Sequence, residues 1–245
     1  MKAEEYAHLR RAEQAHWWYL GLNRLLKHHW NNLLSQETQL RVLDAGCGTG
    51  DSLLRLGENV EKHGIDAAIE ALSYCRLSHL YNTCRASVLD LPYPDSCFDV
   101  VINLDVIYHR NVPDPEVALK EMLRVLRPGG YAFINVPAYE WLRSSHDEHI
   151  QTARRFTRRS LVELLDRAGF AVVRVSYWNT LLFPAAAAIR VWRKADPKPA
   201  SDVAELPGAI TNHVCGLALA LERGWLRVLP LPFGLSVFAV ARKSN

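Results

Sequence analysis

The 245-residue sequence predicts an α/β protein built on a mostly parallel sheet, and three observations carry that prediction. Short apolar runs of strand character alternate with helical patterns between about residues 40 and 137, which is typical of βαβ units. Glycines at alternate positions follow the first apolar run. A content of 49% hydrophobic and 22% charged residues is sufficient to bury such a sheet.

The predicted elements follow one another in a regular order. Gly169 ends one of the later helices, and an insertion at about 179–232 separates the last two strands. A linker rich in proline, alanine and aspartate, 195–208, lies between amphipathic helices of this insertion. In chain order, strands are expected at about 41–45, 60–65, 81–86, 98–104, 131–137, 171–178 and 235–241, and helices at about 51–57, 67–78, 115–126 and 158–168.

The most informative segment is residues 42–50, V-L-D-A-G-C-G-T-G. An apolar strand ends at Asp44, and glycines follow at positions 46, 48 and 50. Glycine lets the backbone turn tightly and approach a ligand where a Cβ atom would intrude. We therefore expect this loop to bind a flat, polar ligand.

A second acidic residue supports a nucleoside ligand. Asp66 lies twenty positions after Gly46, at the end of the second strand, where a carboxylate hydrogen-bonds ribose hydroxyls. The spacing G-x-G-x-G differs from the G-x-G-x-x-G of pyrophosphate loops, and Asp44 would repel a phosphate. The ligand should carry a positive centre or an amino group. A nicotinamide-dependent oxidoreductase is an alternative that explains Asp66 but not Asp44.

The loop resembles the D-x-G-x-G-x-G motif of class I S-adenosylmethionine (SAM)-dependent methyltransferases. Residues 91–101, L-P-Y-P-D-S-C-F-D-V-V, and 124–130, R-V-L-R-P-G-G, resemble further segments of that family, so the resemblance covers about residues 40–140. It implies SAM as the cofactor. It also implies a Rossmann-like, seven-stranded, mostly parallel sheet with helices on both faces, an antiparallel last strand and a helical insertion before it.

A narrower resemblance is to a bacterial subgroup with an N-terminal H-W-W-F segment and a P-A-Y…H-D…R-R-Y-T stretch. Here the corresponding segments are H-W-W-Y at 16–19, and P-A-Y, H-D and R-R-F-T between 137 and 157. Ser87 stands where the family has an acid near adenine, and Tyr108 replaces the glutamate of a frequent E-H pair. Such departures predict that this chain has an acceptor different from those of the subgroup.

Ligands of open parallel sheets bind at the carboxyl ends of the strands. One cofactor could therefore contact four predicted strand ends. The residues expected to bind it are Asp44, Gly46, Cys47, Gly48, Gly50, Asp66, Ala67, Ser87, Val88, Asn103 and Leu104.

The acceptor should enter over the fourth and fifth strand ends, where Tyr108 and Tyr139 lie. Trp17, Trp18 and Tyr19 would form a lid from the N-terminal helix, although an aromatic helix face packed on the core explains them equally well. We expect the acceptor to be a small molecule, either free or linked to a lipid or sugar.

Methyl transfer from a sulfonium is an in-line displacement, for which a protein supplies alignment, exclusion of water and removal of a proton from a hydroxyl or ammonium acceptor. His109 is the first candidate base, and His146 with Asp147 is the second. A histidine that only caps a loop or helix is the alternative for each. A non-catalytic SAM-binding protein is the alternative for the whole chain.

Composition excludes several partners. The net charge is +3 and the basic residues at 154–159 form one short cluster, so no nucleic-acid partner is expected. The five cysteines show no C-x-x-C spacing, which predicts reduced thiols and no metal site. Without a signal peptide or an apolar run of about 18 residues, we expect a cytoplasmic protein. Peripheral membrane contact and the oligomeric state stay open.

The predicted organisation has four parts: an N-terminal helical lid at 1–36, a SAM-binding core at 37–178, a helical cap at 179–232 and the final strand at 233–245. The insertion carries more apolar surface than a connector needs. Packing on the sheet or on a second subunit, an apolar acceptor channel and peripheral lipid contact all explain that surface.

Overall fold

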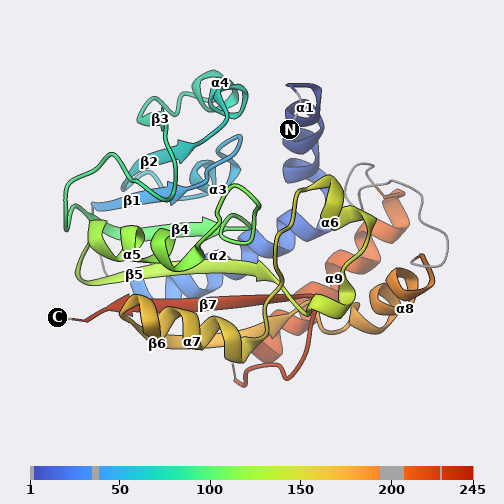
Figure 1. Ribbon diagram of the computed structural model, residues 1–245. Helices are drawn as coiled ribbons and strands as arrows, with labels where there is room; N and C mark the ends of the chain where they lie inside the picture. The colour runs from blue at the N-terminus through green and yellow to red at the C-terminus, as the bar shows by residue number, and fades with distance from the viewer. Residues whose placement is uncertain (1–2, 35–38, 194–206, 227, 245) are drawn as a thin grey trace.

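The computed structural model describes residues 3–34, 39–193, 207–226 and 228–244 (Figure 1). One seven-stranded sheet runs through them. Its strands are β1 (Leu40–Ala45), β2 (Val60–Asp66), β3 (Thr83–Arg85), β4 (Phe98–Leu104), β5 (Leu126–Pro137), β6 (Phe170–Trp178) and β7 (Ser236–Lys243). Their order is β3-β2-β1-β4-β5-β7-β6, and β7 runs in the direction opposite to the other six strands. The predicted fold class and the antiparallel last strand are confirmed.

Helices cover both faces of the sheet. The helices are α1 (Ala3–Ala15), α2 (Trp17–Leu34), α3 (Asp51–Leu54), α4 (Ile69–Leu77), α5 (Pro115–Val125), α6 (Ser145–His149), α7 (Arg158–Ala168), α8 (Phe183–Arg193) and α9 (Ala209–Leu226), with a 3-10 turn η1 (Glu140–Leu142). The buried sides of α5 and α7 pack on one face, and those of α2 and α9 pack on the other (Figure 1). Helices α8 and α9 form the predicted insertion between β6 and β7.

Local sequence explains the best-formed elements. Residues 98–103 of β4 are buried throughout and are apolar apart from Asp99 and Asn103, as expected for a parallel strand covered on both faces. At the start of α5, the Asp114 side chain accepts a hydrogen bond from Glu116 N (2.8 Å), and Pro115 follows as the first helical residue. Thr157 and Ser160 form a capping box at the start of α7, which Gly169 ends in a left-handed conformation.

Several boundaries differ from the prediction. Helix α3 ends at Leu54 instead of residue 57, and β3 keeps only three residues. Strand β5 begins at Leu126, five residues early, because residues 127–130 form an irregular extension that pairs beside β4. The N-terminal segment is two helices, not one. His16 breaks it, since its buried Nδ1 accepts a hydrogen bond from Trp18 N (3.1 Å).

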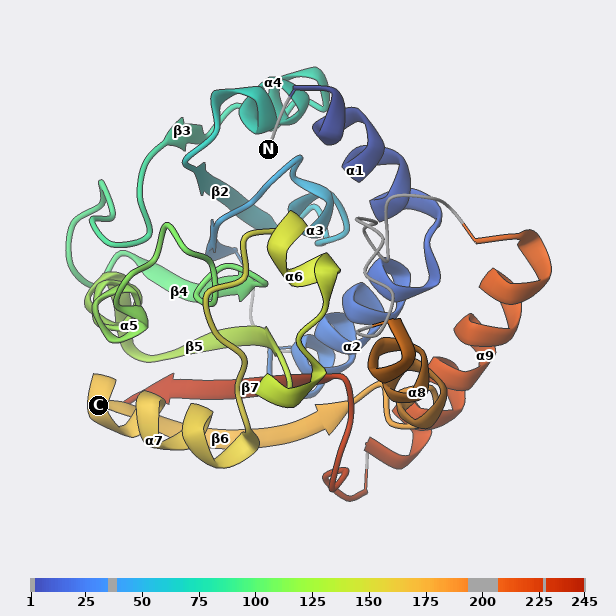
Figure 2. The same cartoon turned by 45° about the vertical axis from the view of Figure 1, so that its right-hand side comes forward.

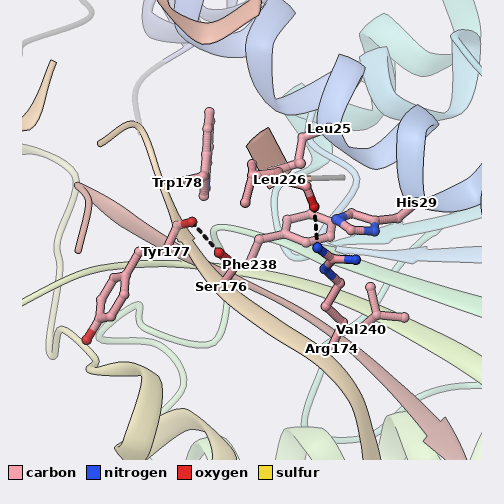
Figure 3. Close-up of a pocket in the computed structure, with 9 residues that line it drawn as sticks. All are labelled: Leu25, His29, Arg174, Ser176, Tyr177, Trp178, Leu226, Phe238 and Val240. Atoms are coloured by element: carbon pink, nitrogen blue, oxygen red, sulfur yellow. Dashed lines mark hydrogen bonds between the residues drawn. The ribbon is translucent and has the colours of Figure 1, made fainter. Parts of the chain in front are cut away.

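Figure 3 shows a small cavity between α2, α9, β6 and β7. His29 lies there, stacked on Phe238 with ring centroids 5.3 Å apart. Burial, with His28 and Arg174 nearby, lowers the pKa of His29 to about 4, so the imidazole is neutral at pH 7. The cavity belongs to the packed core of this face.

No helix in the described part of the chain is long and apolar enough to cross a bilayer.

Candidate active site

The glycine loop joins β1 to α3 at the carboxyl edge of the sheet. Gly46, Gly48 and Gly50 have φ values of 102°, 54° and 86°. A Cβ atom on Gly46 would lie 2.3 Å from Cγ2 of Val106, so neither the conformation nor the space admits a side chain there. The amides of Gly46 and Cys47 both donate to the Ile65 carbonyl (2.9 and 2.8 Å), which fixes the loop against β2.

Asp66 lies at the end of β2, where the sequence predicts the ribose contact. Its carboxylate accepts hydrogen bonds from Gly48 N and Ala68 N, both at 2.9 Å, and it is half-buried. The neighbouring Ala67 is exposed. Asp66 is therefore held at the loop with its carboxylate beside the backbone of Gly48.

The third strand end carries the two residues expected near adenine. Ser87 is exposed, and its hydroxyl accepts a hydrogen bond from Leu89 N (3.1 Å). Val88 is buried among the apolar residues beneath β3 and β4. The turn at 87–90 offers an apolar wall and a hydroxyl, with no carboxylate at position 87.

Two buried carboxyl groups flank the loop. Asp44 is 2% exposed and accepts a hydrogen bond from the Ser52 hydroxyl. Burial, opposed by Ser52 and assisted by Asp66, raises its pKa to about 7. Glu13 of α1 accepts a hydrogen bond from the Thr49 hydroxyl, and burial raises its pKa to about 8. Glu13 was not predicted, because no local pattern connects α1 with a loop 36 residues away.

These residues fit SAM. Flexible glycines leave room for close approach, Asp66 suits two ribose hydroxyls, and Asp44 with Glu13 suits a cationic ligand. Asn103, fully buried, donates to the Ala45 carbonyl (2.7 Å), and its Oδ1 has no hydrogen-bond partner among the described residues.

Cys47 and Leu104 complete the predicted cofactor set. Cys47 is buried, with its Sγ atom 4.0 Å from that of Cys75 on α4. Leu104 is half-buried against the core face that α2 covers. Both side chains therefore shape the apolar backing of the loop.

Asp105 follows β4, at a strand end over which the acceptor is expected to enter. Its backbone is left-handed (φ 62°), and Asn135 Nδ2 donates to both of its carboxylate oxygens at 3.1 and 3.0 Å. Trp178 Nε1 in turn donates to Asn135 Oδ1 (2.8 Å). Burial, opposed by the Asn135 hydrogen bonds, raises the pKa of Asp105 to about 7. Asp105 was not among the predicted site residues, because the side chains that hold it come from strands β5 and β6.

Two tyrosines lie close to Asp105. Burial, followed by the nearby Glu13 and Asp105 carboxyls, raises the pKa of Tyr19. Burial and then Asp105 also raise the pKa of Tyr108, which is 7% exposed. Trp18 adjoins this group, because its ring packs edge-on against Tyr19 (centroids 4.9 Å apart) and lies 5.8 Å from the ring of Trp178. Trp17 N donates to Asn212 of α9 (2.8 Å).

His109 is half-buried, and its Nδ1 accepts a hydrogen bond from Asn111 N (3.2 Å). Burial lowers its pKa. The imidazole is therefore neutral at pH 7 and retains the basic form that proton removal requires.

Asp147 is fully buried and accepts hydrogen bonds from Arg155 Nε and Nη2 at 2.7 and 2.9 Å. Burial opposes ionisation, but Arg155 outweighs it and lowers the pKa of Asp147. This ion pair gives the H-D…R-R spacing a structural reason, since it closes the segment over the end of β5. The side chain of His146 lies outside the described residues.

Tyr139 follows β5 and belongs to an aromatic cluster. Its backbone is left-handed (φ 54°), and its ring stacks on Tyr177 with centroids 5.1 Å apart. Trp141 and Phe183 lie 5.9 and 5.8 Å from the Tyr139 ring, and Phe233 lies 5.3 Å from Phe183. The region where the acceptor is expected to enter is thus bordered by an apolar aromatic cluster.

Residues 43–134 match the family model described as a methyltransferase domain. The matched segment runs from β1 through β2, β3 and β4 into β5 and includes the glycine loop, so this part of the chain carries a methyltransferase domain. This chain is 35% identical over 148 residues to the ubiquinone/menaquinone biosynthesis C-methyltransferase UbiE of Xanthomonas oryzae, covering 53% of this chain and 56% of the relative. It is 34% identical over 122 residues to a fatty-acid O-methyltransferase of Mycolicibacterium smegmatis, covering 45% of this chain and 44% of the relative. The chain thus spans about half the length of these relatives.

Solved structures share the fold of this chain. Phosphoethanolamine N-methyltransferase 2 of Haemonchus contortus, solved with SAM, superimposes with a TM-score of 0.59 at 17% identity, over 91% of this chain and 53% of that one. The [4+2]-cyclase SpnF superimposes with a TM-score of 0.56 at 20% identity, over 91% of this chain and 80% of that one.

Proposed function

We propose that this chain transfers a methyl group from SAM to a small organic acceptor that enters over the carboxyl ends of β4 and β5. When bound, SAM supplies a methyl group on a cationic sulfur. The acceptor forms a bond to the methyl carbon while the carbon–sulfur bond breaks and its electron pair stays on sulfur. A hydroxyl, ammonium or acidic carbon acceptor also gives up one proton, so the site needs a proton acceptor.

The observation that carries the proposal is the Asp105 carboxylate, held by Asn135 at a strand end next to the glycine loop. Asp44 and Glu13 would stabilise the positive charges of the cofactor, and Asp66 would hold its ribose. Asp105 would take the acceptor proton. Its pKa of about 7 leaves about half of the carboxyl groups ionised at neutral pH, as a general base requires.

His109 is the competing base, and two variants separate the two groups. Asp105→Asn keeps the size of the side chain, so we expect turnover to fall about 10²–10⁴-fold if Asp105 removes the proton, with SAM affinity nearly unchanged. His109→Ala should then change turnover by less than about tenfold. The reverse pattern would assign the proton transfer to His109. Steady-state formation of S-adenosylhomocysteine measures both variants.

An apolar acceptor, free or lipid-linked, fits the surroundings of Tyr139. The ring cluster of Tyr139, Trp141 and Phe183 borders the acceptor side, and aromatic faces bury large apolar areas. The names of the two curated relatives, which refer to quinone biosynthesis and to fatty acids, support the same chemical class.

Residues 179–232 would cap the acceptor side. Arg190 of α8 lies close enough to Asp147 to lower its pKa, which brings the insertion near the segment that follows β5. Deleting residues 195–208, which lie mostly outside the described residues, should leave SAM binding intact and change acceptor turnover. Loss of SAM binding by a folded deletion variant would contradict the cap.

The function is tested by incubating the protein and SAM with fractionated metabolite and lipid extracts. Mass spectrometry should find a product heavier by one CH2 group, formed in equal amount to S-adenosylhomocysteine. SAM binding without product in any fraction would favour a non-catalytic SAM-binding protein. SpnF is a cyclase with this fold, so the fold together with SAM binding would not be enough to establish methyl transfer.

A further inference from the structure

The carboxyl group of Asp105 has no cationic partner in the described part of the chain. Asn135 Nδ2 donates to both of its oxygens (3.1 and 3.0 Å), but a neutral amide does not balance a charge. The buried Asp147 is paired with Arg155, whereas no ion pair between described residues includes Asp105. A carboxylate withdrawn from water without a counter-charge is destabilised, so a cationic ligand would complete it.

A ligand can reach Asp105. The residue is half-buried, although Asn103 before it and Ile107 after it are fully buried. Its neighbour Val106 fills the space beside Gly46, so Asp105 lies next to the glycine loop, where the cofactor is expected. Both views show the carboxyl ends of β4 and β5 directed towards the side of the molecule where α1 and α6 lie (Figures 1 and 2).

Aromatic rings at the start of α2 and the end of β6 adjoin this group. Trp178 Nε1 donates to Asn135 Oδ1 (2.8 Å), which places its indole next to the amide that holds Asp105. The ring of Trp18 lies 5.8 Å from that of Trp178, and the ring of Tyr19 lies 4.9 Å from that of Trp18. Trp18 and Tyr19 are half-buried, so parts of both side chains stay open to a ligand.

Tyr19 and Tyr108 lie within electrostatic reach of Asp105. Burial and nearby carboxyl groups, Asp105 among them, raise the pKa of both phenols, so both stay neutral at pH 7. The faces of aromatic rings attract cations, and the attraction grows where water is excluded. A carboxylate with tyrosine and tryptophan rings nearby therefore has the composition of a site for an organic ammonium group.

The cationic groups of SAM have other partners available. Asp44 and Glu13 lie at the glycine loop, where Glu13 Oε1 is 3.8 Å from the position that a Cβ atom of Gly48 would take. Asp105 follows the neighbouring strand β4, over which the acceptor is expected to enter. A neutral hydroxyl or carbon acceptor would leave Asp105 without a counter-charge before the reaction, whereas an ammonium supplies one.

We propose that the acceptor is an amine, bound as its ammonium form between Asp105 and the rings of Trp18 and Tyr19, and methylated on nitrogen. This substrate class rests on the proposed methyl-transfer function. The ammonium gives one proton to the Asp105 carboxylate, which frees the electron pair of the nitrogen. That pair forms the bond to the methyl carbon while the carbon–sulfur bond breaks and its electrons stay on sulfur. An apolar body on the amine would lie along the aromatic cluster of Tyr139.

Binding of a matched pair of small molecules tests the charge. The probes are 2-phenylethylamine and 2-phenylethanol, which are similar in shape and differ in the ammonium group. Calorimetry at pH 7.5 measures both on protein saturated with S-adenosylhomocysteine. We expect the amine to bind at least about tenfold more tightly, the scale of a hydrogen bond to a charged group. Asp105→Asn should remove this preference, and Glu163→Gln, a matched change in an exposed ion pair of α7, should keep it.

A second variant guards against misfolding of the first. Trp18→Leu removes one ring and should weaken amine binding about threefold more than alcohol binding. Both variants should bind S-adenosylhomocysteine nearly as the wild type does, which shows that the fold is intact. Equal binding of the amine and the alcohol by the wild type would overturn the inference.

Fractionated extracts distinguish the substrate class from the methyl-transfer function. An acidified metabolite extract is passed over a strong cation exchanger, which retains amines, and both fractions are neutralised and incubated with the protein and SAM. S-adenosylhomocysteine should form with the retained fraction and not with the other. Formation only with the unretained fraction would keep methyl transfer and rule out an amine acceptor. No formation with either fraction would contradict methyl transfer, and the probe comparison would then decide whether the site binds an ammonium.

Discussion

Asp44 makes cofactor affinity dependent on pH. Its carboxyl group is 2% exposed, and burial raises its pKa to about 7 in the ligand-free protein. A cationic ligand beside it favours the ionised form, so binding should release a proton wherever Asp44 is protonated beforehand. Affinity should then rise with pH as Asp44 ionises.

The size of the effect follows from the ionised fraction. With a pKa of about 7, Asp44 is about one-tenth ionised at pH 6 and about nine-tenths ionised at pH 8. Ionisation of Asp44 alone should therefore increase affinity about tenfold across this interval. Glu13, whose pKa burial raises to about 8, extends the rise towards pH 9.

Calorimetric titration with S-adenosylhomocysteine, which keeps the cationic amino group and is chemically stable, measures this profile. Asp44→Asn should make the rise between pH 6 and 8 about tenfold smaller and leave the part that Glu13 contributes. Glu163→Gln, a matched change in an exposed ion pair of α7, should leave the profile unchanged. A flat wild-type profile, or an equal slope in Asp44→Asn, would refute this role of Asp44.

Three further predictions concern binding and stability. Asp66→Ala should weaken SAM binding by about 1–3 kcal/mol in calorimetry, the scale of hydrogen bonds to a charged group, and tight NAD binding without SAM binding would contradict the assignment. Asp147→Ala should lower the free energy of unfolding by about 3–5 kcal/mol, because it leaves the Arg155 guanidinium buried without its partner; a loss below about 1 kcal/mol in urea titration would show that the pair is solvated. His29 has a folded pKa of about 4, below its unfolded value of 6.5, so its contribution to stability is present above pH 6.5 and is lost as the pH falls towards 4. Urea unfolding should show a loss of about 1 kcal/mol between pH 7.5 and 5.5 that is absent from His29→Leu.

The cofactor half of the site was readable from sequence because its signals are local. The glycine loop, Asp66 and the apolar strand runs all lie within residues 40–104, where strand periodicity and glycine spacing report directly on the backbone. The structure places Asp44, Asp66 and Asn103 at adjacent strand ends, as expected for parallel strands. The contacts of these residues with SAM remain predictions.

The acceptor half was less predictable, because its polar groups are brought together from distant segments. Asp105, Asn135 and Trp178 form one hydrogen-bonded series across three strands, and Glu13 reaches Thr49 from another helix. Neither set of contacts can be recognised from a pattern within a short stretch of sequence. The broken N-terminal helix was missed for a similar reason, since the lone His16 that caps α2 resembles any helical histidine.

The position of β7 has a consequence for how the chain acquires its structure. This strand is last in sequence order yet lies between β5 and β6, and seven residue pairs join it to β5. While the protein is being synthesised, β1 to β5 can pair with one another, but β6 has no neighbour in the sheet until residues 236–243 have left the ribosome. The insertion helices emerge in that interval with their apolar surfaces uncovered. Chains stalled within residues 179–235 should therefore be the most dependent on chaperones.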